Sequence, residues 1–498
     1  MRHLLFIFIL TLSNSILLSQ DYNILDFGAK PDAFTLNTSF IQSAIDAASQ
    51  NGGGRVIIPS GRFLSGSILL KTGVELHLLS NAVLLGSTDI RDYKKLHRWK
   101  ALVMADNQTN IAITGAGEID GQGRQLALHI DSLFYAGQID SADYMFAEKR
   151  PKWYLRPQII EFVKCRDIVV RNVTLRNAAC WVQTYDQCHN ITIDSVTVNS
   201  DAYWNNDGID IQDCHNVRIL HCDINSADDG ICLKSQSRDH LCDSISITDC
   251  KVRSSASAIK FGAVSHGGFR NVIIDDIRIY DTFRSALAIE CVDGGILDNV
   301  KVKNIYAVNT GNAIFIRLGD RNEKGSAGLL KNISITNMKV NVASGRPDDA
   351  YEIRGPELPF FHNTFPSSIT GIPGHPVENV TLENIEINYP GRGNNGIANM
   401  PLSRLKDVPE NEAAYPEFSM FGELPAWGFY VRHMDGLIMN NIRLNIQSPD
   451  YRPALIFDDV HHLDIHSMFI EGDQKLNKII LHNTSHVNID KEQAVLKM

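Results

Sequence analysis

The chain has 498 residues, of which 44% are apolar, and its formal net charge is −10 at pH 7. That length exceeds the usual size of one globular core, but a solenoid of stacked coils escapes the limit because each coil is buried only by its neighbours. The negative charge excludes a general attraction to nucleic acid or to an anionic membrane surface. An anionic substrate would therefore need a local basic patch.

The first 20 residues have the pattern of a secretory signal. Arg2 and His3 precede an apolar run from Leu4 to Leu12, which is too short to span a membrane. No other segment reaches the length of an apolar membrane span. We therefore expect an exported protein, periplasmic or secreted, in which residues 21–498 form a single domain.

Residues 21–65 are predicted to form an N-terminal cap region. Apolar side chains recur there at helical spacing, namely at Phe40, Ile41, Ala44, Ile45 and Ala48. The glycines at 52–54 end this helix, and a strand follows. A helix in this place would cover the open edge of the first coil, which otherwise invites aggregation.

Residues 66–490 repeat a unit of strand, turn and strand. The unit is a polar residue, often Asn, followed by alternating apolar positions, as in Asn190-Ile191-Thr192-Ile193. Alternation with a period of two indicates strands with one face inward, and spacings of about 23 to 28 residues leave no room for a crossover helix. The repeat predicts an all-β fold, a parallel β-helix. Longer insertions near 121–156, 343–376 and 390–430 would form the walls of a binding groove.

The nine cysteines point neither to disulfides nor to a metal site. Cys165, Cys188, Cys214 and Cys242 each precede an Ile or Val by three residues, and no tight cluster of Cys and His appears. We expect cysteine to serve as a small apolar residue, stacked in register inside the solenoid. No metal and no cofactor are predicted.

Two carboxylate motifs stand one coil apart. Asn205-Asn206-Asp207-Gly208-Ile209 is echoed 22 residues later by Ala227-Asp228-Asp229-Gly230-Ile231. Neighbouring coils stack about 4.8 Å apart, so Asp207, Asp228 and Asp229 should meet in one outer patch. Carboxylates this close cannot all ionise freely, and at least one raised pKa is expected. A carboxyl that donates a proton beside one that activates water is what acid-base hydrolysis requires.

A further stretch joins the aspartate motifs in indicating a known family. It is Asp26-Phe27-Gly28-Ala29-Lys30, near the start of the mature chain. Together these motifs resemble glycoside hydrolase family 28, the polygalacturonases and rhamnogalacturonan hydrolase-like pectinases. The resemblance implies a single-stranded right-handed parallel β-helix of the pectin-lyase type and inverting hydrolysis of pectic polysaccharide. It also implies that Asp228 is the general acid, that Asp207 and Asp229 hold and activate water, and that Asn205 contacts the substrate.

The sequence departs from that family's pattern on the next two coils, where the family has a Gly-His-Gly and an Arg-Ile-Lys motif. Alignment of the strands puts Ser257 at the histidine, Ala288 at the arginine and Glu290 at the lysine. In the family the basic pair grips a galacturonate carboxylate beside the cut. Its loss weighs against endo-cleavage of plain polygalacturonan.

Strand parity predicts outward-facing charges that replace this pair. Lys234, Lys260 and Arg317 fall on the aspartate-bearing face, and we expect them to bind an anionic sugar. Glu290 would then hydrogen-bond the hydroxyls of a neutral neighbour such as rhamnose. The alternative is that these charges pair among themselves as a solvated ladder. His266 lies just past the missing motif and either serves the lost histidine's role or is an ordinary turn residue.

Three functions are compatible with these features. The first is an exported glycosidase whose substrate is an anionic polysaccharide or oligosaccharide. The second is a polysaccharide lyase on the same fold, with a Lys or Arg base and commonly calcium. The third is a non-catalytic carbohydrate-binding solenoid, in which the aspartates only cap turns. The cluster of three aspartates favours the first, and the exact linkage, the exo or endo mode and the oligomeric state stay open.

Overall fold

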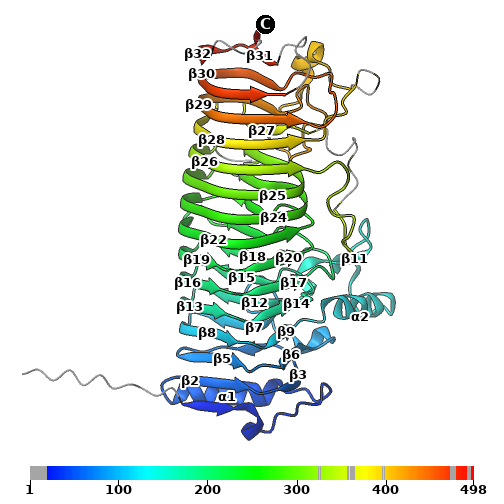
Figure 1. The fold of residues 1–498 in the computed structure, drawn as a ribbon. Coiled ribbons are helices and arrows are strands. Elements are labelled where there is room, and N and C mark those ends of the chain that lie inside the picture. Colours follow the sequence, from blue (N-terminus) through cyan, green and yellow to red (C-terminus); the bar gives the residue numbers. More distant parts are fainter. Residues whose placement is uncertain are drawn as a thin grey trace, which may run out of the picture.

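The computed structural model describes residues 20–322, 325, 327–355, 358, 365–394, 396, 399–471, 478–490 and 495–498. The strands stack into one tall column, in which coil follows coil from the N-terminal to the C-terminal end (Figure 1). Strands of consecutive coils pair in parallel along the column. The predicted all-β fold, a right-handed parallel β-helix, is therefore confirmed.

Three ladders of parallel strands run along the column. The first carries the aspartate motifs and contains β4 (Ile68–Leu69), β7 (Ala101–Asp106), β12 (Gln158–Val163), β15 (Gln183–Asp186), β18 (Ile209–Gln212), β21 (Ile231–Ser235), β23 (Ile259–Ser265), β27 (Ser367–Thr370), β31 (Ile479–His482) and β33 (Val495–Lys497). The second contains β1 (Asp21–Asn23), β2 (Gly54–Ile58), β5 (Val74–Leu78), β8 (Thr109–Gly115), β13 (Arg166–Arg171), β16 (His189–Asp194), β19 (His215–Leu220) and β32 (Ser485–Ile489).

The third ladder and the longest strands complete the column. The third ladder contains β3 (Gly61–Ser65), β6 (Ala82–Gly86), β9 (Glu118–Asp120), β14 (Thr174–Arg176), β17 (Thr197–Ser200) and β20 (Asp223–Ser226). The strands that bend across two or three ladders are β22 (Cys242–Ser254), β24 (Gly268–Cys291), β25 (Ile296–Leu318), β26 (Leu329–Val342), β28 (Val377–Tyr389), β29 (Phe429–Ile446) and β30 (Leu455–Ile470).

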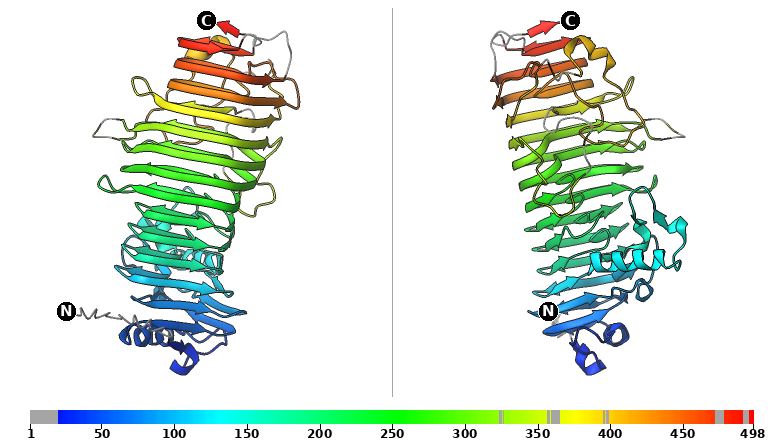
Figure 2. Two further views of the ribbon diagram at one scale, coloured as in Figure 1. Left: turned by 60° about the vertical axis from the view of Figure 1, so that its left-hand side comes forward. Right: turned by 90° about the vertical axis from the view of Figure 1, so that its right-hand side faces the viewer.

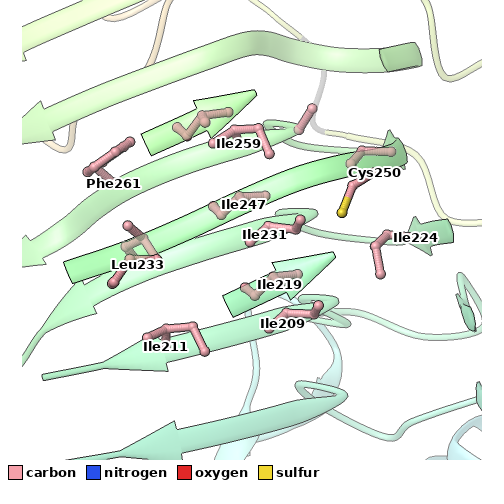
Figure 3. Packing of buried hydrophobic residues seen from close by; sticks show 14 of the residues in the cluster. Ile209, Ile211, Ile219, Ile224, Ile231, Leu233, Ile247, Cys250, Ile259 and Phe261 are labelled. Atoms are coloured by element: carbon pink, nitrogen blue, oxygen red, sulfur yellow. The ribbon is translucent and has the colours of Figure 1, made fainter. Parts of the chain in front are cut away.

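The core fills the inside of the coils. Ile209, Ile231 and Ile259 are buried and occupy equivalent positions on successive strands of the first ladder (Figure 3). Burial of one such side chain stabilises the fold by roughly 1.5–3 kcal/mol. Successive side chains of a strand point to opposite faces. The neighbours of these inward-pointing residues along each strand therefore point outward, toward the surface that carries the aspartates.

Seven of the nine cysteines lie in this core, whereas Cys180 lies outside it and Cys232 lies beside the aspartates. All nine are buried and free. The Cys165 N–H donates to Cys188 Sγ at 3.3 Å, and the Cys188 N–H donates to Cys214 Sγ at 3.3 Å. Stacking of cysteine as a small apolar residue is therefore confirmed.

A helix covers the N-terminal end of the column. Helix α1 (Thr38–Gln50) buries Ile41, Ala44, Ile45 and Ala48, and it packs against β1, β2, β4 and β5 (Figure 1). The predicted cap helix is confirmed. The predicted signal falls on residues 1–19, outside the described part, and on Gln20. Among the described helices, none combines the length and the apolar character that a membrane crossing requires.

Three insertions leave the coils. The early insertion (residues 121–156) holds helix α2 (Gly123–Tyr135), the short antiparallel pair β10 (Tyr144–Met145) and β11 (Arg150–Pro151), and the turns η3 (Ser141–Asp143) and η4 (Trp153–Leu155). Helix α2 projects to the side of the column (Figure 2). The middle insertion is described at residues 343–355, 358 and 365–376, and the late insertion at residues 390–394, 396 and 399–430 with η5 (Leu402–Asp407). Two further turns are η1 (Ile24–Phe27) and η2 (Ile90–Asp92).

Candidate active site

The two aspartate motifs lie directly before strands β18 and β21 of the first ladder. Ile209 pairs with Ile231, and the register continues into the motifs because the Gly208 N–H donates to the Asp229 carbonyl at 2.9 Å. A side chain at 208 would bring its Cβ within 2.6 Å of the Gly230 carbonyl, so glycine allows the close approach of the two coils. Equivalent residues of the motifs therefore lie one coil apart.

The structure brings the three predicted aspartates together. Carboxylate oxygens of Asp207 and Asp229 lie within 4.8 Å of each other and of Cys232 Sγ. Asp228 lies beside them, because its Oδ1 accepts the Asp229 N–H at 3.0 Å and its Oδ2 accepts Asn205 Nδ2 at 3.3 Å. Asp207 and Asp229 are buried, whereas Asp228 is only partly buried. Of the three carboxyls, that of Asp228 is the most accessible to a ligand.

Lys234 links two aspartates of the preceding coil. Its Nζ lies 2.9 Å from Asp207 Oδ2 and also pairs with Asp210 Oδ1, while the Trp181 ring centroid lies 4.2 Å away. Burial disfavours the charge of Lys234, but the two carboxylates outweigh it and keep its pKa well above the usual value. Burial also raises the pKa of Asp207, and that of Asp210 to about 6, and the neighbouring carboxylates add to this rise while Lys234 opposes it.

Lys260 forms the corresponding pair one coil later. Its Nζ lies 3.0 Å from Asp229 Oδ2 and donates to the Tyr415 hydroxyl at 3.1 Å. The Ser257 N–H donates to Asp229 Oδ1 at 3.1 Å. Burial alone would raise the pKa of Asp229, but the charges of Lys260, Lys234 and Arg284 outweigh it and lower that pKa. Asp229 is therefore held in its ionised form.

Asp228 has the opposite electrostatic environment. Burial raises the pKa of Asp228, the negative charge of Asp229 raises it further, and Arg284 opposes both without cancelling them. Two adjacent carboxyls thus have pKa values displaced in opposite directions. One retains its proton while the other is ionised, which is the division that acid-base hydrolysis uses.

The group of Asp207, Asp229 and Cys232 has spacings that suit a metal ion. Its negative charges are already matched, however, because Lys234 and Lys260 place ammonium groups 2.9 Å and 3.0 Å from the two carboxylates. Burial raises the pKa of the Cys232 thiol well above its usual value, which keeps it protonated. The arrangement is therefore that of an ion-pair network.

Glu290 and Arg317 are paired positions on the next two coils of the first ladder, but both are 1% exposed. Burial raises the pKa of Glu290 to about 8, and its Oε2 has no hydrogen-bond partner among the described residues. Arg317 donates to the carbonyls of Gly371 at 2.9 Å and of Glu410 at 2.7 Å. These contacts give Arg317 the role of anchoring the late insertion.

His266 lies away from the aspartates. It follows the last residue of β23, whereas the aspartate motifs precede the first residues of their strands. A strand rises about 3.3 Å per residue, so the seven residues of β23 separate His266 from that end of the ladder by roughly 20 Å. The structure does not bring His266 to the site.

Several residues of the site were not found by sequence reasoning. The sequence does contain a signal for Arg284. Ile231 and Leu287 are aligned through β23, and Arg284 precedes Leu287 by three residues just as Asp228 precedes Ile231. Tyr415 had no such signal, because it reaches Lys260 from 155 residues further along the chain.

A parallel β-helix with clustered carboxyls of opposed pKa has the features of a solenoid hydrolase. The family model for glycosyl hydrolases family 28 matches residues 49–408, and the chain belongs to this family of glycosidases. The resemblance inferred from the motifs is therefore confirmed.

Individual relatives agree with this assignment. A probable polygalacturonase from Vitis vinifera is 27% identical over 337 residues, which are 64% of this chain and 60% of that protein, so the match spans less than two thirds of that relative. The family 28 exopolygalacturonase of Yersinia enterocolitica has a TM-score of 0.65 at 17% identity, with 96% of this chain and 79% of that one covered. An exopolygalacturonase from Thermotoga maritima has a TM-score of 0.62 at 22% identity, covering 86% and 92%. The two structures share the fold.

Proposed function

We propose that this protein is an exported, inverting glycosidase that hydrolyses a uronic-acid glycosidic bond in a pectic polysaccharide or oligosaccharide. One observation carries the proposal: Asp228 and Asp229 are neighbours, yet the pKa of the first is raised and that of the second is lowered. Membership of a glycosidase family supports the same chemistry. The activity is of the polygalacturonase type.

Asp228 is the proposed general acid. Its carboxyl gives a proton to the glycosidic oxygen, and the leaving sugar departs as an alcohol. Asn205 Nδ2, 3.3 Å from Asp228 Oδ2, orients this carboxyl, and Arg156 Nη2 holds Asn205 by donating to its Oδ1 at 2.8 Å. The same amide group of Asn205 is a proposed contact for the substrate.

Asp229 and Asp207 are proposed to hold the attacking water. Asp207 Oδ1 is buried and has no hydrogen-bond partner among the described residues, so it can hydrogen-bond the attacking water. Asp229, kept ionised by Lys260, takes the proton as water attacks the anomeric carbon. Attack on the side opposite the leaving group inverts the configuration of that carbon.

Lys234 and Lys260 are proposed to favour an anionic substrate through their charge. Both are buried and paired with aspartates, so they act as fixed cations beneath the site. Because Ala288 and Glu290 stand where the family has its basic pair, we propose a neutral sugar such as rhamnose on that side of the scissile bond. Direct contact with substrate by Glu290 or Arg317 would need a rearrangement, since both are buried.

Defined oligosaccharides from polygalacturonan and from rhamnogalacturonan test this function. We expect products that have gained one water by mass spectrometry, and an inverted anomeric centre in the first product seen by NMR. Asp228→Asn should lower kcat by roughly 10²- to 10⁴-fold, the usual contribution of a general acid, with an unchanged circular dichroism spectrum. Asp223→Asn, on the exposed face of β20, is the matched control.

Two outcomes would overturn the proposal. An unsaturated, ultraviolet-absorbing product whose formation stops in chelator would identify a lyase. Tight binding of the same oligosaccharides by the wild-type protein without any product would identify a carbohydrate-binding solenoid. Detection of the mature chain outside the cytoplasmic fraction of the producing cell tests export separately.

A further inference from the structure

A pocket of about 420 Å³ opens beside Asp228. Its volume falls in the range of small-ligand sites, roughly 300–1,000 Å³. Its floor is formed by successive coils where they enter the first ladder, and its walls come from the early and middle insertions. The pocket is therefore built by segments that are far apart in the sequence.

The floor repeats one position of the coil. Asp228, Ala256 and Arg284 are equivalent residues on three successive coils, and backbone hydrogen bonds between the coils keep this register. Coils stack about 4.8 Å apart, so Arg284 stands roughly 10 Å along the column from Asp228. Ala256 between them has only a methyl group, which leaves room for a ligand above it.

Three guanidinium groups line the pocket. The Arg284 side chain is 17% exposed and has Glu417 as an ion partner at 3.5 Å. Arg150 pairs with Glu148, and Arg354 pairs with Asp349 at 3.4 Å, with its side chain half-exposed at the rim. Each of the three has a carboxylate partner, and three arginines around one pocket, in a chain whose net charge is −10, favour an anionic ligand that competes with these partners.

An aromatic surface completes the pocket. Trp204 is 39% exposed, and Arg150 lies over its ring at 4.9 Å from the centroid. A flat aromatic ring beside a few charged groups suits a ligand that has both an apolar face and a charge. A sugar ring with a carboxylate has these two properties, and guanidinium groups match the carboxylate in geometry.

We propose that this pocket binds a uronic-acid residue of the substrate next to the scissile bond, with its carboxylate at Arg284, its ring against Trp204 and Arg354 at the rim. The inference rests on the proposed function and adds to it the residues that select the acidic sugar. In place of the family's basic pair, this chain uses Arg284, which occupies the position equivalent to Asp228 two coils later.

The position of Arg284 also connects recognition to catalysis. In the free protein Arg284 lowers the pKa of Asp228, against the larger effects of burial and of Asp229. A substrate carboxylate at Arg284 offsets that positive charge and increases the proton affinity of Asp228. Binding of the acidic sugar therefore keeps the proposed general acid protonated.

The first test measures binding by calorimetry in the Asp228→Asn background, where no turnover interferes. The probes are an oligogalacturonate and the same oligosaccharide with its carboxyl groups reduced to alcohols. We expect the acidic probe to bind about 10- to 100-fold more tightly, the range that charge-assisted hydrogen bonds supply. Addition of Arg284→Ala with Glu417→Gln, which leaves no unpaired carboxylate, should remove this preference.

Two further variants sharpen the result. Arg354→Ala, at the rim, should reduce the preference by a smaller factor. Arg278→Ala, an exposed arginine of β24 outside the pocket, should leave it unchanged. In the otherwise native enzyme, Arg284→Gln should move the alkaline limb of the kcat/KM profile to higher pH, because a cation that lowers the pKa of Asp228 is gone. That shift reports the charge of Arg284 beside Asp228, and the calorimetry alone reports its contact with the acidic sugar.

The outcomes separate the pocket from the proposed function. If the Arg284 variants keep the full preference for the acidic probe, the pocket proposal is wrong while the catalytic roles stand. If Asp228→Asn turns over substrate at the wild-type rate, the proposed function itself fails, whatever the binding data show.

Discussion

Two sets of side chains stack from coil to coil in this molecule, and their chemistry differs. On the second ladder, exposed asparagines form amide chains, in which Asn299 Nδ2 donates to Asn271 Oδ1 at 2.7 Å and Asn379 Nδ2 donates to Asn332 Oδ1 at 3.2 Å. On the first ladder the stacked side chains are charged and buried. The same stacking geometry thus supports a neutral, exposed ladder and a charged, buried one.

The difference shows what each ladder is for. An amide both donates and accepts, so identical residues can repeat without limit. Charges cannot, and the first ladder alternates them, with Asp207 paired to Lys234 and Asp229 paired to Lys260. Buried ion pairs contribute little net stability because both charges lose their hydration. Their position beside Asp228 indicates that they serve the chemistry of the site, while the amides serve the turns.

The largest expected effect comes from removing one buried cation. Lys260→Met leaves Asp229 buried and unpaired, which should cost roughly 3–5 kcal/mol of unfolding free energy. The pKa of Asp229 should rise toward or above its usual value, so the acid limb of the kcat/KM profile should move to higher pH. Denaturant unfolding and a pH series of initial rates measure the two effects.

The matched variants separate charge from packing. Lys303→Met removes a lysine that pairs with Asp275 at 3.0 Å on the exposed side, and it should change stability by less than about 1 kcal/mol. Lys260→Met combined with Asp229→Asn should regain much of the lost stability without regaining activity. Equal losses in the Lys260 and Lys303 variants would remove the distinction between the two ladders.

A second, pH-dependent effect is expected at Glu290. Its pKa of about 8 in the folded protein lies above the ordinary 4.5. The folded protein therefore binds this proton more tightly, and the resulting stability is fully present below pH 4.5 and is lost as the pH rises toward 8. The Glu290→Gln variant has no carboxyl to ionise, so it does not lose this stability as the pH rises. Its unfolding free energy should exceed that of the wild type by a few kcal/mol above pH 8, and the two should converge near pH 4.

Thermal midpoints measured at a series of pH values check this prediction. The quantity of interest is the difference between variant and wild type, since other groups titrate equally in both. A difference that does not change with pH would show that Glu290 has the same pKa in the folded and unfolded protein, which contradicts the prediction. Glu386→Gln, on the exposed side of β28, serves as the control because it pairs with Lys339 at the surface.

The smallest effect is expected in the amide ladder. Asn299 has a φ of +59°, a conformation that favours Asn or Gly. Asn299→Gly keeps that conformation and loses one exposed hydrogen bond, whereas Asn299→Ala adds about 1 kcal/mol of backbone strain. Both variants should retain wild-type kcat/KM. A loss of activity in either would contradict the separation of the two ladders.

The sequence allowed the ladders to be predicted because their signals are local and repeated. Period-two alternation fixed which side chains face outward, and it placed Lys234 and Lys260 correctly on the face of the aspartates. It did not predict that their ammonium groups are buried. That burial depends on residues such as Tyr415, which no short-range pattern connects to Lys260.

The remaining site residues illustrate the same limit of local patterns. Arg317 lies in the column that parity predicts, but the late insertion occupies its guanidinium with backbone carbonyls. His266 was considered because it follows a missing motif by a few residues. A strand rises about 3.3 Å per residue, so a residue that lies only a few positions further along the strand can be far away in space. His266 is therefore near the missing motif in sequence but distant from the aspartates.

The late insertion has a consequence for the order in which the protein is made. Tyr415 and Glu417 reach back to Lys260 and Arg284, which belong to coils synthesised much earlier. A nascent chain that ends before residue 399 contains every aspartate of the cluster but lacks these two partners. The working site is therefore finished only when the ribosome has passed the last insertion, so truncated translation products carry the acidic residues without their complete surroundings.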